Sequence, residues 1–167
     1  MIPDLIARVL SEGLGVSFLI LGTGEPHLHE ALANLQWRFP RRCAVVLAYN
    51  EGVAHQLYAG SDFLLMPSRV EPCGLNQMYS MRYGTVPIVR SVGGLRDTVI
   101  DLGEPNLPGR GIRFDQFSLD DAVTAIYRAH QLYHNSSSLQ EVRQRIMEVD
   151  FSWEGAAENY IKVYESL

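Results

Sequence analysis

Residues 63–89 read FLLMPSRVEPCGLNQMYSMRYGTVPIV, and this stretch decides the fold. Its first four residues are all apolar, which is typical of a buried strand. A loop with two prolines and a glycine follows at 67–74, and a helix is expected at 75–83. Gly84 separates that helix from a second apolar run at 86–89. A strand, a crossover helix and a second strand in this order predict a parallel pair.

The same alternation of short apolar runs and helical periodicity extends over the rest of the chain. Further strands are expected at 16–21, 44–47 and 111–114, and further helices at 5–10, 29–39, 51–58, 119–133, 139–149 and 153–167. A turn is expected at 93–94, an exposed loop at 101–110 and a short polar linker at 135–138. The predicted fold class is therefore α/β, a three-layer α/β/α, Rossmann-like domain whose parallel sheet has helices on both faces. Ligands bind beyond the carboxyl ends of the strands in such sheets, which selects the loops at 22–26, 48–51, 67–74 and 90–95.

Composition limits the classes of protein to which the chain can belong. With 167 residues, 47% of them hydrophobic and 20% charged, it has the make-up of one globular domain, residues 1–167. Its net charge of −5 argues against non-specific nucleic-acid binding, and no apolar run approaches the roughly 20 residues of a membrane helix. Cys43 and Cys73 fit no disulfide or zinc pattern, and the start shows no signal peptide. A reducing, cytoplasmic location without membrane or nucleic-acid partners is expected.

The loop at 67–74 is the richest candidate site. It leaves an apolar strand and opens a helix, so free backbone N–H groups at the helix start favour an anionic group such as a phosphate. Glu71 lies at the mouth of the loop, where its carboxylate can accept hydrogen bonds from sugar hydroxyls. The alternative interpretation is that Glu71 only caps the helix that follows.

Other candidate residues allow two interpretations each. Gly93 and Gly94 permit close approach of another backbone, although a tight turn between a strand and a helix is the simpler interpretation. Tyr49 follows a predicted strand and can either stack on a base or lie half-buried at the rim of the site. His27 and His29 suggest a metal site, but their spacing does not bring both rings to one face of a helix, so a solvated helix start is expected.

Several segments taken together resemble a known family. They are PSRVEPCGLNQMY at 67–79, MRYGTVP at 81–87 and GGLRDTV at 93–99, with the weaker tail DFSW at 150–153. The chain resembles the C-terminal domain of bacterial glycogen synthases and plant starch synthases, which are retaining glycosyltransferases of the GT-B architecture. Sucrose- or trehalose-type transferases of the same architecture usually carry a second glutamate where this chain has Tyr79. Val70, Asn76 and Val92 depart from the bacterial pattern, the last two in the manner of plant starch synthases.

The resemblance implies a role for each candidate site residue. Glu71 is implied to hold the hydroxyls of the donor glucose as the catalytic residue. The implied donor-binding residues are the backbone of Cys73 and Gly74 at the glucose, Leu75 and Asn76 at the distal phosphate, Tyr49 against the adenine, Tyr79 near the ribose, and Gly93 and Gly94 at the diphosphate. No metal and no cofactor other than the nucleotide sugar is expected.

The implied activity is the retaining transfer of glucose from ADP-glucose, or UDP-glucose, to the non-reducing end of an α-1,4-glucan. The glucan would bind through an N-terminal domain outside this sequence. The first strand of the C-terminal domain, whose Arg and Lys clamp the diphosphate in the family, would also lie outside this sequence. The helix within residues 150–167 would cross toward that N-terminal domain, and the chain alone would lack activity. If the chain comes from a plant, the expected location is the plastid stroma. The alternative is a stand-alone nucleotide-binding or regulatory module without catalysis.

Overall fold

The computed structural model describes every residue from Met1 to Leu167. Its elements in chain order are α1 Ile2–Ser11, β1 Phe18–Leu21, α2 Pro26–Arg38, β2 Cys43–Val46, α3 Glu51–Gly60, β3 Phe63–Met66, α4 Asn76–Arg82, β4 Val86–Arg90, α5 Gly93–Thr98, β5 Ile112–Phe114, α6 Leu119–His134, α7 Ser136–Met147 and α8 Trp153–Glu165. Every predicted strand is present, and α5 is the one helix that the sequence did not indicate. None of the helices combines the length and the apolar character that crossing a membrane needs.

All strands pair in parallel, but their hydrogen bonds form two sheets instead of the single sheet expected. β1 pairs with β2, and Phe18 lies opposite Cys43. The second sheet has the order β3-β4-β5, with Phe63 opposite Val86. The α/β class and the parallel pairing are confirmed, and the expectation of one continuous sheet is wrong because no backbone ladder joins the two groups of strands.

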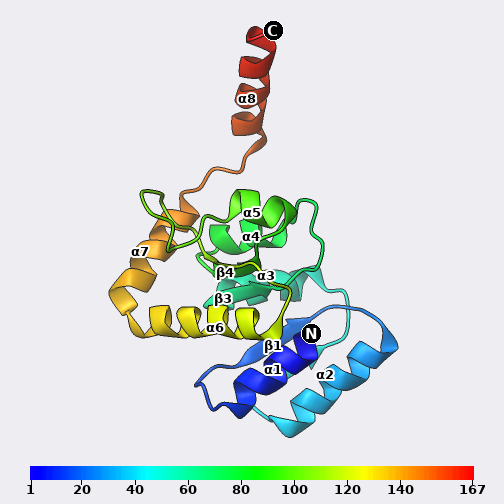
Figure 1. Cartoon of the computed structure of the whole chain (residues 1–167). Helices are drawn as coiled ribbons and strands as arrows, with labels where there is room; N and C mark the ends of the chain where they lie inside the picture. Colours follow the sequence, from blue (N-terminus) through cyan, green and yellow to red (C-terminus); the bar gives the residue numbers. More distant parts are fainter.

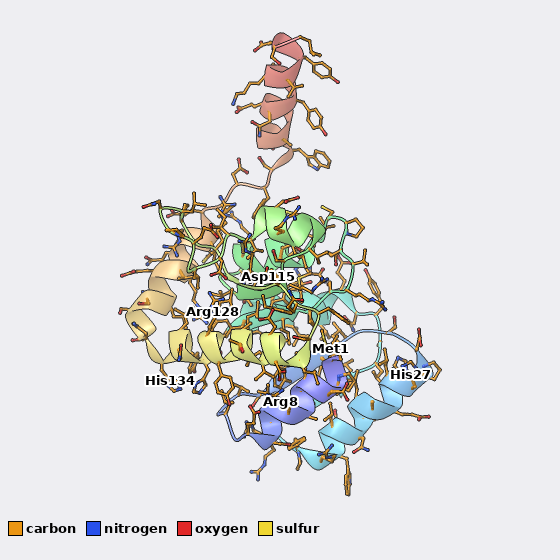
Figure 2. The ribbon with its side chains drawn as sticks, viewed as in Figure 1. Met1, Arg8, His27, Asp115, Arg128 and His134 are labelled. Carbon is orange, nitrogen blue, oxygen red and sulfur yellow. The ribbon has the colours of Figure 1, made fainter.

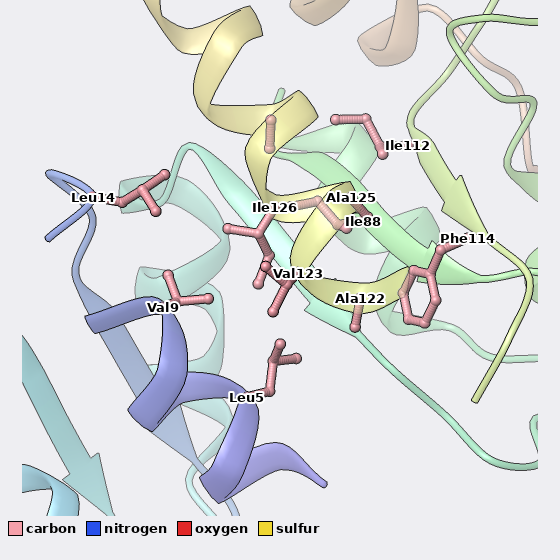
Figure 3. Close-up of a cluster of buried hydrophobic side chains, with 11 residues drawn as sticks. Leu5, Val9, Leu14, Ile88, Ile112, Phe114, Ala122, Val123, Ala125 and Ile126 are labelled. Carbon is pink, nitrogen blue, oxygen red and sulfur yellow. The ribbon is translucent and has the colours of Figure 1, made fainter. Parts of the chain in front are cut away.

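Helices cover both faces of the three-stranded sheet. On one face, α1 and α6 pack against Ile88 of β4 in the cluster shown in Figure 3. On the other face, α4, α5 and α7 enclose Val89 of β4 together with Met81, and both of these side chains are fully buried. Neighbouring side chains of a strand point to opposite faces, so a strand that is buried on both faces must be apolar throughout. The continuous apolar run at 86–89 follows from this arrangement.

Two predicted connections are wrong. Residues 135–138 are not a linker, because Asn135 is the N-cap of α7 and its Oδ1 accepts a hydrogen bond from the N–H of Ser138 at 3.2 Å. Residues 93–94 are more than a turn, since Gly93 is the first residue of α5. Serine and glycine have weak helix propensity, so composition alone conceals both helix starts.

The exposed loop at 101–110 is confirmed, and Asp101 anchors its beginning. Oδ1 of Asp101 accepts hydrogen bonds from Arg128 Nη2 at 2.6 Å and Gly103 N at 2.7 Å, and Oδ2 accepts one from Arg113 N at 2.6 Å. Burial acts to raise the pKa of this carboxyl, but the three hydrogen bonds outweigh burial and hold the pKa below its ordinary value. One carboxylate thereby joins α6, β5 and the loop.

Helix α8 stands apart from the rest of the molecule. Figure 1 shows it projecting away from the packed helices and strands, beyond an extended connection from α7. None of its residues is buried, and Trp153 and Tyr164 are 87% and 72% exposed. Figure 2 shows its aromatic side chains extending into solvent along the helix. A helix with this much uncovered apolar surface is typical of one that packs against a partner.

Candidate functional site

Backbone carbonyl groups fix the loop between β3 and α4, residues 67–75. Six of these carbonyl oxygens accept hydrogen bonds from three donors that lie in β4, α5 and α4. The pairs are Arg90 Nη1 with Ser68 O (3.3 Å) and Arg69 O (2.9 Å), Gly94 N with Glu71 O (3.3 Å) and Pro72 O (3.2 Å), and Gln77 Nε2 with Cys73 O (3.2 Å) and Gly74 O (3.0 Å). The acceptors of the loop are therefore engaged by the body of the protein.

The N–H groups of the same loop have the opposite arrangement. None of the N–H groups from Ser68 to Met78 donates a hydrogen bond to another atom of the chain, and the first that does is that of Tyr79, to the carbonyl of Leu75. Those of residues 76–78 form the first turn of α4, which no side chain caps. A loop with its acceptors engaged and its donors free presents a concentration of positive partial charge. This surface can bind an anion, and because α4 has only seven residues the loop amides matter more than the helix dipole.

Gly93 and Gly94 allow the start of α5 to lie directly against this loop. A Cβ at Gly94 would be 2.1 Å from the carbonyl oxygen of Cys73, and one at Gly93 would be 2.0 Å from that of Glu71. Gly93 also has a φ of 46°, which residues with a Cβ rarely adopt. The close-approach interpretation is therefore correct, and the backbone that these glycines approach is that of the 67–75 loop.

Gln77 is a site residue that the sequence analysis did not identify. Its side chain is fully buried, and Nε2 donates to Thr98 Oγ1 at 3.1 Å in addition to the two loop carbonyls. The Thr98 hydroxyl in turn donates to the carbonyl of Gly94 at 2.6 Å, so a single amide connects the loop to α5. A glutamine at the second position of a helix carries no sequence signal of this role. Arg90 was missed for the same reason, since its partners are 21 and 22 residues away in the chain.

Glu71 has a carboxylate that no other side chain engages. The residue is partly exposed at the mouth of the loop, and its oxygens take part in no hydrogen bond or ion pair within the chain. The alternative interpretation, in which Glu71 caps the following helix, is wrong because the N-cap of α4 is Leu75. The carboxylate is thus available to accept hydrogen bonds from a bound molecule.

Tyr79 belongs to an aromatic cluster between α3 and α4. Its ring centroid is 6.2 Å from that of Tyr58 and 6.5 Å from that of His55, and His55 Nδ1 lies 3.0 Å from the hydroxyl of Tyr83. Burial raises the pKa of Tyr58, with a further contribution from Tyr79. Tyr49 lies outside this cluster, in the loop before α3, with 86% of its surface exposed.

The structure brings most of the predicted site residues to one place. The 67–75 loop and the glycines of α5 are in backbone contact, and the side chains of Cys73, Leu75 and Asn76 are exposed there. No group of three or more His, Cys, Asp or Glu side chains gathers in a way that could hold a metal ion. A pocket of about 270 Å³ lies beside Asp62, which precedes β3, and so is at the opposite end of that strand from the loop.

These features define a Rossmann-like α/β domain in which a loop with free backbone N–H groups follows the carboxyl end of β3, an edge strand of the three-stranded sheet. Residues 1–131 match the family model described as glycosyl transferases group 1, and the chain belongs to that family.

Within this family, the relatives with similar sequences are glycogen synthases. The chain is 48% identical over 165 residues to the glycogen synthase of Flavobacterium johnsoniae and 46% identical over 166 residues to that of Myxococcus xanthus. Each alignment covers 98% of the chain and 34% of the relative, so the chain spans about a third of the length of these relatives.

Solved structures agree with the sequence relatives. The catalytic domain of starch synthase IV from Arabidopsis thaliana, solved with ADP and acarbose, matches with a TM-score of 0.87 and 32% identity over 99% of the chain and 34% of that structure. Sucrose-phosphate synthase from Thermosynechococcus elongatus, at 20% identity and a TM-score of 0.70 over 98% of the chain and 41% of that structure, shares the fold alone. The predicted family and its GT-B C-terminal domain fold are confirmed.

Proposed function

We propose that the chain is the donor-binding domain of a glycogen or starch synthase. The whole enzyme transfers glucose from ADP-glucose to the non-reducing end of an α-1,4-glucan with retention of configuration. The observation that carries the proposal is the 67–75 loop, with its carbonyls engaged, its N–H groups free and Glu71 unpaired at its mouth. The resemblance to glycogen synthases, and to a starch synthase solved with ADP, supports this choice of donor.

Within the loop, the sugar and the phosphates are recognised by different groups. Glu71 accepts hydrogen bonds from hydroxyls of the donor glucose, because its oxygens have no competing partner in the chain. The free N–H groups of residues 73–76 donate to the glucose and to the distal phosphate. Gly94 uses its N–H to hold the loop, so at the start of α5 the N–H of Gly93 is the one left for the diphosphate.

The nucleoside is held by aromatic side chains from two other segments. Tyr49, with most of its ring uncovered, stacks on the adenine, and Tyr79 lies near the ribose at the edge of the α3–α4 aromatic cluster. Stacking on Tyr49 tolerates different bases, so the assignment of ADP-glucose rather than UDP-glucose as the donor is supported by the family resemblance and not by the geometry. Competition between ADP and UDP for the same site tests it directly.

The proposed chemistry needs more than this chain supplies. Breaking the bond between the sugar and the phosphate develops positive charge on the sugar and negative charge on the departing diphosphate. Preorganised N–H donors of the 67–75 loop stabilise that leaving group. Arg90 donates through Nη1 to the carbonyls of Ser68 and Arg69, so its main role here is to hold the loop. The further cations, the glucan site and the exclusion of water belong to the part of the enzyme outside this sequence.

Two structural features mark where that remaining part would attach. We propose that the exposed aromatic face of α8 packs against the N-terminal domain, since none of its residues is buried here. We also propose that the first strand of the domain, expected before this sequence, lies between β1 and β3, where the two sheets are not hydrogen-bonded to each other.

Two measurements test the proposed function. Calorimetric titration of the chain with ADP-glucose is expected to show saturable binding that ADP reverses. In the longer protein that contains the N-terminal domain, labelled glucose from ADP-glucose should enter glycogen as an α-linkage, and Glu71→Ala should lower kcat by about 100-fold or more with an unchanged Tm. Binding without transfer by the longer protein would favour a non-catalytic module, and transfer by the chain alone would refute the division of roles.

A further inference from the structure

The last two turns of α6 carry a pair of histidines that the proposed function does not use. His130 and His134 are four residues apart on one face of the helix, and their Nε2 atoms lie 3.1 Å from each other. The ring centroids are 4.4 Å apart with the planes at 73°. His134 is exposed and His130 partly exposed, and Figure 2 shows His134 at the C-terminal end of α6.

This separation suits two nitrogens bound to one metal ion. Imidazole nitrogens bind Zn²⁺ at about 2.0–2.1 Å, so two of them 3.1 Å apart subtend about 95–102° at the ion. That angle lies between the square-planar and the tetrahedral value. The i, i+4 spacing puts both rings on one face of the helix, so rotation of the rings about χ2 is the adjustment by which both nitrogens would face one ion.

Two helix ends of opposite partial charge meet beside the pair. His134 is the last residue of α6, where unpaired carbonyl groups carry partial negative charge, and α7 begins two residues later at Ser136, where free N–H groups carry partial positive charge. The chain as a whole has a net charge of −5. Without an ion, the two imidazoles can share one N–H···N hydrogen bond, in which one ring donates and the other accepts.

We propose that His130 and His134 form a two-histidine site for a divalent transition-metal ion. No third His, Cys, Asp or Glu joins them, so water fills the other coordination positions. Such an open site with two imidazoles binds Cu²⁺ more tightly than Ni²⁺ or Zn²⁺, and it does not select Mg²⁺, which prefers oxygen ligands. The bound ion links two turns of α6 and binds only the folded chain, so at a free ion concentration c it stabilises the fold by RT ln(1 + c/Kd), an amount that grows with the logarithm of c above Kd.

The test uses the untagged chain, with the Tm and the calorimetric Kd measured in CuCl2, NiCl2 and MgCl2. Cu²⁺ and Ni²⁺ are expected to raise the Tm and Mg²⁺ to leave it unchanged. His130→Asn and His134→Asn, made separately, should each weaken Ni²⁺ binding by about 100-fold, because each removes the gain from simultaneous binding by two linked ligands.

The chain contains its own matched control in a second histidine pair. His27 and His29 are two residues apart near the start of α2, so a joint His27→Asn and His29→Asn variant should bind Ni²⁺ as the unmodified chain does. Electron paramagnetic resonance of the Cu²⁺ complex should show coupling to two nitrogens, and to one in either single α6 variant. Unchanged Ni²⁺ affinity in the His134 variant, loss of affinity in the control, or no binding by the unmodified chain would each overturn the proposal.

Discussion

Replacing Gly94 by alanine is expected to displace the 67–75 loop. The new Cβ would lie 2.1 Å from the carbonyl oxygen of Cys73 and 2.6 Å from its Cα, closer than the 3.0 Å below which Cβ contacts are essentially never seen. The two backbones must therefore move apart by most of an ångström. Gly94 has no positive φ, so the change tests the contact between the backbones and not the dihedral angles of the glycine.

The expected loss of stability follows from two contributions. Forcing an extra carbon into a filled position destabilises a protein by about 1–3 kcal/mol. Moving the backbones apart also removes the shared hydrogen bond from Gly94 N to the carbonyls of Glu71 and Pro72, at 3.3 and 3.2 Å, which contributes about 0.5–1.5 kcal/mol. Together they predict a decrease of about 1.5–4.5 kcal/mol in the free energy of unfolding. For a chain of this size that corresponds to a Tm lower by roughly 3–18 °C.

Urea unfolding followed by circular dichroism measures the effect, with Gly60→Ala as the control. A Cβ at Gly60, the last residue of α3, would meet no atom within 4 Å, so that variant should be neutral or more stable by up to about 1 kcal/mol. Gly94→Ala should also weaken ADP-glucose binding, whereas Gly60→Ala should not. If the two variants unfold at the same urea concentration, the contact does not hold the loop as described.

Four further changes test other parts of the structure. Gln77→Leu should lower the free energy of unfolding by about 1–3 kcal/mol and weaken ADP-glucose binding, because it deprives loop carbonyls of their donor; an unchanged urea midpoint would exclude this role. The folded-state pKa of Asp101 is lowered, so its carboxylate contributes its full stability above the unfolded pKa of about 3.9 and loses it as the pH falls through the folded value. Asp101→Asn should therefore destabilise by about 1.5–3 kcal/mol at pH 7 and by progressively less in acid, while the exposed Asp97→Asn should change stability by less than about 0.5 kcal/mol at either pH, both read from urea midpoints. Met81→Ala should reduce the free energy of unfolding by about 2–5 kcal/mol, since the side chain is fully buried, and a loss below 1 kcal/mol would contradict its place in the core. Deleting residues 153–167 should leave the urea midpoint unchanged, because α8 buries no residue, and a clear loss would show that α8 packs on the chain.

Much of the candidate site could be located from the sequence because its signals are local. The strand Phe63–Met66, the loop that leaves it and the helix that follows are neighbours in the chain, and a parallel sheet places such loops together at its carboxyl edge. The position of Glu71 in this loop predicts either a ligand contact or a helix cap, and the family resemblance implies the contact with the donor sugar. The exclusion of Glu71 as a helix cap needed coordinates, because the N-cap is four residues further on at Leu75.

The sequence by itself determined the fold class, the family and the position of the 67–75 loop, since periodicity and a contiguous motif are properties of short segments. Only the tertiary structure decided how that loop is held. The pairing of β3 with β4 sets Val89 opposite Met66, and this register brings the next residue, Arg90, within reach of the carbonyls of Ser68 and Arg69. Gln77 and Gly94 likewise act on atoms of segments that meet only after folding. Which backbone groups remain free for a ligand depends on these distant donors, and no local pattern encodes their positions.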